Sequence, residues 1–73
     1  DYEQAFRYLG IASSIEPDNA QHLFNIAITA DRVGKRKEAI KYYEKALEAD
    51  AVYGSGRTIP RETIYDRLSV LRR

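Results

Sequence analysis

The spacing of apolar residues predicts that most of this chain is helical. Between residues 20 and 30, apolar and small side chains recur three or four positions apart, which places them on one helical face: Leu23, Ile26, Ala27 and Ala30. A second face of this kind follows between residues 35 and 50: Ala39, Ile40, Tyr43, Ala46 and Leu47. The positions between these are charged, as expected of a solvated face: Lys37, Glu38, Lys41, Glu44, Lys45 and Glu48.

Two more helices are predicted towards the ends of the sequence. The first covers residues 5–15, with Ala5, Phe6, Leu9 and Ala12 on its apolar side. The last lies within residues 60–73, with Ile64, Tyr65, Leu68 and Leu71 turned inward. No segment alternates between apolar and polar residues with a period of two, so no strand is predicted. The expected fold class is all-α, with about four antiparallel helices.

Helix boundaries are marked by local signals. Pro17 ends the first helix, and Asp18 with Gln21 has the spacing of a capping box, while Asn19 is also a good N-cap. Gly34 supplies a left-handed stop for the second helix. After residue 50 the apolar pattern lapses, residues 53–57 are typical of a loop, and a proline at position 60 is expected in the first turn of the last helix.

An internal repeat underlies this pattern. Sliding the sequence by 34 residues aligns Ala5 with Ala39, Phe6 with Ile40, Tyr8 with Tyr42, Leu9 with Tyr43, Ala12 with Ala46 and Glu16 with Asp50. A period of 34 residues with two helices per unit is the tetratricopeptide pattern. The sequence therefore resembles the tetratricopeptide repeat (TPR) family.

The resemblance implies an α-solenoid fragment made of four parts. Residues 1–19 would be the second helix of one repeat, and residues 20–53 a complete repeat. Residues 54–59 would form a linker, and residues 60–73 a helix that caps the stack. Small residues allow the two helices of a repeat to approach closely, and they stand at Ala27, Ala39 and Ala46.

Composition narrows the function classes. The chain has 73 residues with twelve Lys and Arg against eleven Asp and Glu, which argues against a strongly basic nucleic-acid domain. Residues 57–73 hold five Arg against two acids, but they lack the interleaved exposed aromatic residues on which the bases of single-stranded nucleic acids stack. No apolar run approaches the roughly 20 residues of a membrane span. Because the sequence contains no Met, we expect that residue 1 is not a natural start and that the chain was cut from a longer one or processed.

Candidate chemistry is sparse. His22 is the only imidazole and has no Cys, Ser or acid at a spacing that builds a catalytic set, so we interpret it as a structural surface residue. Residues 54–58 lack the spacing and Lys of a phosphate-binding loop. The acids Glu44, Glu48 and Asp50 are separated along what is predicted to be a surface helix. We expect no enzymatic activity, no metal and no cofactor.

A peptide-binding face is the better candidate. In tetratricopeptide arrays the first-helix face that does not pack on its partner helix lines a concave groove. Here the resemblance places Gln21, Phe24, Asn25, Ile28 and Arg32 on that face. Apolar anchors would then stand beside an amide that can bond a peptide backbone. The alternative is that Phe24 and Ile28 pack against the first helix of a neighbouring repeat.

Some family members hold a C-terminal carboxylate between Asn and basic residues of successive first helices. Asn25 matches one such Asn. Arg67 matches a basic position if Tyr65, Leu68 and Ser69 take the roles of Leu23, Ile26 and Ala27 in a delayed third unit. Thr63 stands where a further Lys is expected, which weakens the match.

The expected function is noncatalytic protein–protein interaction with a peptide or protein partner, as a scaffold. The alternative is a structural role in which the segment caps or positions another domain, or forms homo-oligomers through an exposed repeat edge. Neither nucleic-acid binding nor membrane insertion is expected of this segment.

Overall fold

The computed structural model describes residue 4, residues 19–54 and residues 58–73. Within this part the fold is all-α, with no strand and with three helices: α2 (Ala20–Arg32), α3 (Arg36–Tyr53) and α4 (Arg61–Leu71). The helix predicted over residues 5–15, the capping residue predicted at Asp18 and the loop residue Arg57 lie outside the described residues.

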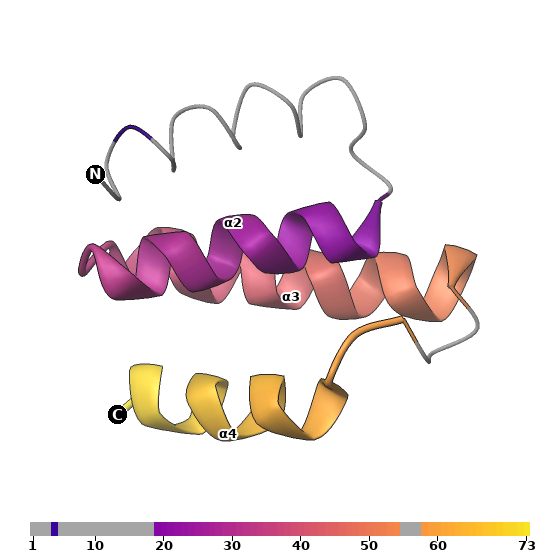
Figure 1. Cartoon of the computed structure of the whole chain (residues 1–73). Coiled ribbons are helices and arrows are strands. Elements are labelled where there is room, and N and C mark those ends of the chain that lie inside the picture. Colours follow the sequence, from indigo (N-terminus) through magenta and orange to yellow (C-terminus); the bar gives the residue numbers. More distant parts are fainter. Residues whose placement is uncertain (1–3, 5–18, 55–57) are drawn as a thin grey trace.

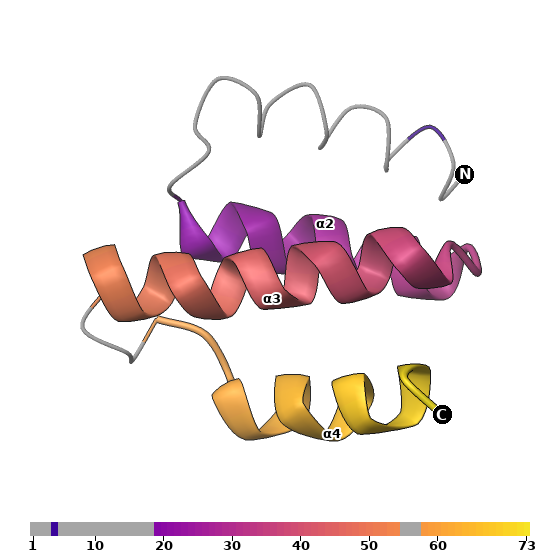
Figure 2. The same cartoon turned by 180° about the vertical axis from the view of Figure 1, so that it is seen from behind.

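The three helices lie side by side and reverse direction at each connection (Figure 1). The more extensive backbone contact joins α2 to α3, and a smaller one joins α3 to α4. Seen from behind, α4 again lies along α3 and runs antiparallel to it (Figure 2). No helix in the described part of the chain is both long and apolar enough to cross a membrane.

The two ends of α2 are fixed by the residues that the sequence singled out. The Asn19 side chain accepts a hydrogen bond from the backbone N–H of His22 at 3.0 Å, so Asn19 is the N-cap. At the other end Gly34 has a φ of +82°, the left-handed conformation that glycine adopts without strain. This turn lets the Lys35 N–H donate to the Ala30 carbonyl at 2.9 Å, which closes a Schellman-type stop.

The core is centred on a line of alanines between α2 and α3. Four of them have no exposed surface: Ala27, Ala30, Ala39 and Ala46. Their small side chains let the two backbones approach closely, and the larger Leu23 and Tyr43 fill the space around them. Because both helices contribute alanines, this alanine seam defines which faces of α2 and α3 meet.

Helix α3 extends further than the apolar pattern indicates. It continues through residues 51–53 and ends where the Gly54 N–H donates to the Asp50 carbonyl at 2.9 Å. The segment contains neither Gly nor Pro before position 54, so nothing in it breaks the helix. Val52 and Tyr53 are exposed, so this last turn is held by backbone hydrogen bonds and not by burial.

One residue predicted to face inward on α4 does not. Tyr65 is 51% exposed, whereas Ile64 and Leu68 are buried and Leu71 is half-buried. Residues 64 and 68 are four apart and share one helical face, whereas residue 65 is turned about 100° away from residue 64. Instead, Tyr65 accepts a hydrogen bond from the Arg61 guanidinium at 3.1 Å.

We expect Ala46→Trp to destabilise the protein by about 1–3 kcal/mol or more, because the alanine seam leaves no room for a larger side chain. The free energy of unfolding from urea titrations followed by circular dichroism would measure the loss. Ala51→Trp is the matched control, since Ala51 is exposed on the same helix. Equal stability of the Ala46 variant and the wild type would contradict the packing described here.

Candidate functional site

The α2 residues expected to line a groove lie along one side of the helix, at intervals of three or four positions. Their exposure to solvent differs, because the polar side chains are exposed and the apolar ones are partly buried. Gln21, Asn25 and Arg32 are exposed, and Phe24 and Ile28 are half-buried. This set is called the α2 face below.

Two amides on the α2 face bind each other. The Gln21 side-chain nitrogen donates to the Asn25 side-chain oxygen at 3.2 Å, across one helical turn. The pair keeps the Asn25 amide nitrogen as a donor and the Gln21 oxygen as an acceptor. One donor and one acceptor side by side can satisfy the C=O and N–H of an extended peptide backbone.

The apolar part of the α2 face also belongs to the rim of the core. The rings of Phe24 and Tyr43 lie 6.4 Å apart at an interplanar angle of 50°, a tilted aromatic pair between α2 and α3. Ile28 packs against the same core cluster. Phe24 therefore has a structural contact within its own helix pair, in addition to the surface that it leaves exposed.

Arg67, the candidate site residue outside α2, is engaged within the chain. Its Nε donates to one carboxylate oxygen of Asp31 and its Nη2 to the other, both at 2.8 Å. This two-pronged geometry is the one that an arginine would use to hold a ligand carboxylate. Tyr65 is exposed whereas Leu23 is buried, so the two residues that the match of Arg67 aligns differ in burial.

Asp31 was not identified from the sequence, yet it joins all three helices. It lies in the last turn of α2, binds Arg67 of α4 and accepts a hydrogen bond from the Tyr43 hydroxyl of α3 at 3.0 Å. The hydrogen bonds from Arg67 hold the pKa of Asp31 below its usual value, against the opposing effect of burial. Burial, together with the bond to Asp31, raises the pKa of Tyr43 to about 12.

Asp50 corrects a second expectation. It was predicted on a surface helix, but it has no exposed surface. Its carboxylate accepts hydrogen bonds from the Thr58 hydroxyl, from the Thr58 N–H at 2.7 Å and from the Arg61 Nη1 at 2.8 Å. The Thr58 hydroxyl contributes most to a pKa of Asp50 below the usual range. A Cβ at Gly54 would lie within 3 Å of both Asp50 and Thr58, so glycine leaves the room that this contact needs.

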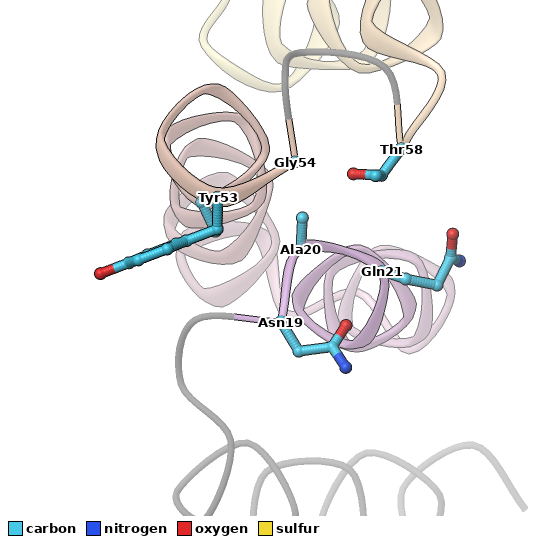
Figure 3. Close-up of a pocket in the computed structure, with 7 residues that line it drawn as sticks. Asn19, Ala20, Gln21, Tyr53, Gly54 and Thr58 are labelled. Atoms are coloured by element: carbon cyan, nitrogen blue, oxygen red, sulfur yellow. The ribbon is translucent and has the colours of Figure 1, made fainter.

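A cavity of about 180 Å³ lies between the start of α2 and the end of α3. Figure 3 shows the Thr58 hydroxyl and the Ala20 methyl group turned towards it, while the Tyr53 and Gln21 side chains point away. The polar side chains at its edge already have partners, because Asn19 caps α2 and Thr58 binds Asp50. We therefore place the candidate site on the α2 face and not in this cavity.

His22 is half-buried in the first turn of α2. Among the described residues, no three His, Asp or Glu side chains are grouped so that they could hold a metal ion. Every buried polar side-chain atom in this part of the chain has a hydrogen-bond partner. The buried polar groups of this part therefore leave no unpaired atom for a ligand.

Comparisons with models of known protein families, with curated proteins and with solved structures find no significant match.

Asp31 and Asp50 make the folded protein less stable as the pH falls. Because their folded-state pKa values lie below the unfolded value of about 3.9, the stability they contribute is present above that value and is lost as the pH falls through the folded values. We expect the urea midpoint to fall less steeply on acidification in an Asp31→Asn/Asp50→Asn double variant than in the wild type.

Glu48→Gln is the control, because it removes an exposed carboxylate from α3. Its urea midpoint should follow the pH dependence of the wild type. A double variant with the full pH dependence of the wild type would show that these two carboxylates do not carry it.

Proposed function

We propose that this chain is a noncatalytic protein–protein interaction segment that binds an extended peptide on the α2 face. The observation that carries the proposal is the amide pair of Gln21 and Asn25 beside the half-buried Phe24 and Ile28. Such a surface combines backbone recognition with apolar anchors, the combination that supplies specificity and affinity at peptide grooves.

We further propose that the chain is a fragment of a tetratricopeptide α-solenoid with four helices. The 34-residue period supports this, as do the alanine seam and the antiparallel pairing of α2 with α3. In this arrangement α2 and α3 form one repeat, and α4 begins the next unit as a cap. The α2 face would then belong to the concave side of the array.

The chemistry of the ligand follows from the charges on and beside this face. The fork of Arg67 is filled by Asp31, so Arg67 is not available to hold a terminal carboxylate. The amides of Gln21 and Asn25 carry no charge. We therefore favour an internal, extended segment of a partner, recognised through its backbone and one or two apolar side chains, over a C-terminal carboxylate.

The test uses peptides selected from a random library displayed on phage, with the chain as the target. For peptides selected in this way, we expect Asn25→Ala and Ile28→Ala each to weaken binding by about 2 kcal/mol or more, as truncation of an anchor typically does. Fluorescence anisotropy would measure the affinities, and circular dichroism would confirm that each variant is folded.

Lys41→Ala is the control on the outer face of α3, where the Lys41 ammonium lies 5.5 Å from the centre of the Tyr42 ring. It should leave the affinity nearly unchanged. Binding that survives the α2 changes but is lost in this variant would move the site to the outer face. If the chain instead sediments as an oligomer that Phe24→Ala dissociates, the self-association alternative is favoured.

A further inference from the structure

Helix α4 is attached to the other helices largely through arginines. Near its start Arg61 binds the buried Asp50, and near its middle Arg67 binds Asp31. Just beyond its end Arg72 binds Glu44 of α3. These three pairs are called the arginine contacts below. A fourth arginine, Arg36 at the start of α3, donates to the carbonyls of Leu71 and Arg73.

The apolar attachment of α4 is small by comparison. Only Ile64 and Leu68 of its eleven residues are buried, and its backbone contacts α3 much less than α2 does. The α2–α3 pair is joined instead by the alanine seam and its surrounding large side chains. The two attachments thus differ in kind, since one depends on charge pairs and the other on close packing.

A released α4 would not remain helical. Its eleven residues fall below the length of about 12–15 residues at which an isolated helix becomes even marginally stable in water. Docking and helix formation are therefore coupled for α4. Loss of the Arg61 or the Arg67 contact removes a charge-assisted hydrogen bond and leaves the Asp50 or the Asp31 carboxylate without its arginine, which weakens docking. The Arg72–Glu44 pair is exposed on both sides and contributes less.

We propose that α4 is a releasable helix, which undocks and melts as one unit when its arginine contacts are lost while the α2–α3 pair stays folded. Opening would uncover Asp31, Asp50 and the side of α3 that α4 covers in one step. This inference does not depend on peptide binding at the α2 face.

Amide hydrogen exchange of the full chain, read by NMR, tests the proposal. Arg67→Gln should lower the protection of the α4 amides by about tenfold or more, because a hydrogen bond to a charged group is lost. The amides of Ala27 and Ala46 should change by no more than about twofold, since they belong to the other unit. Arg73→Gln is the matched control: it removes the same charge from an exposed position and should leave all protection unchanged.

Two results of this experiment would overturn the proposal. If all three helices lose protection equally, α4 belongs to one cooperative unit with α2 and α3. If α4 keeps its protection, the arginine contacts do not hold it.

The same exchange measurement on the wild type gives an independent test, which holds even if the Arg67 variant does not fold. In low concentrations of urea, the α4 amides should form their own group, with a weaker urea dependence than the α2 and α3 amides, because opening α4 alone exposes less surface. A single shared urea dependence for all three helices would equally refute the proposal.

Discussion

The close approach of α2 and α3 is the constraint on which the rest of the structure depends. Four alanines without exposed surface allow that approach, and no larger residue could stand in their place without separating the helices. The approach brings Tyr43 beneath the α2 face, where its ring meets Phe24 and its hydroxyl reaches Asp31. The alanine seam thus sets the rim of the candidate site as well as the core, although none of its residues is exposed to a ligand.

The third helix is attached in a different physical way. Two carboxylates hold α4 against the α2–α3 pair. Asp31 accepts hydrogen bonds from Arg67, and Asp50 accepts them from Thr58 and Arg61. Each carboxylate receives at least three hydrogen bonds, which compensates the loss of hydration on burial. Attachment of this kind is specific in register and sensitive to the loss of any one partner. The fold therefore combines a close-packed pair with a third helix held by polar contacts.

This division bears on function, because it decides which polar groups remain for a partner. Arg67 and Asp31 satisfy each other, so the charge of Arg67 is used within the fold. The amides of Gln21 and Asn25 bind each other, but the Asn25 nitrogen remains as a donor and the Gln21 oxygen as an acceptor. The amides beside half-buried apolar side chains can bond an extended peptide backbone.

Local signals in the sequence determined the helices: Asn19 and Gly34 act on their own backbone neighbourhood, and the spacing of Leu23, Ala27 and Ala30 marks the buried stripe of α2. The same spacing located Gln21 and Asn25 on one side of that helix. Only the tertiary structure decided that Asp50 is buried, that Tyr65 is exposed and that Arg67 binds Asp31. Asp31 and Arg67 are 36 residues apart, and no local pattern records which distant charge will face an arginine once the helices pack. Helix formation depends on residues within one turn of each other, whereas the partner of a charged side chain depends on how whole helices are placed.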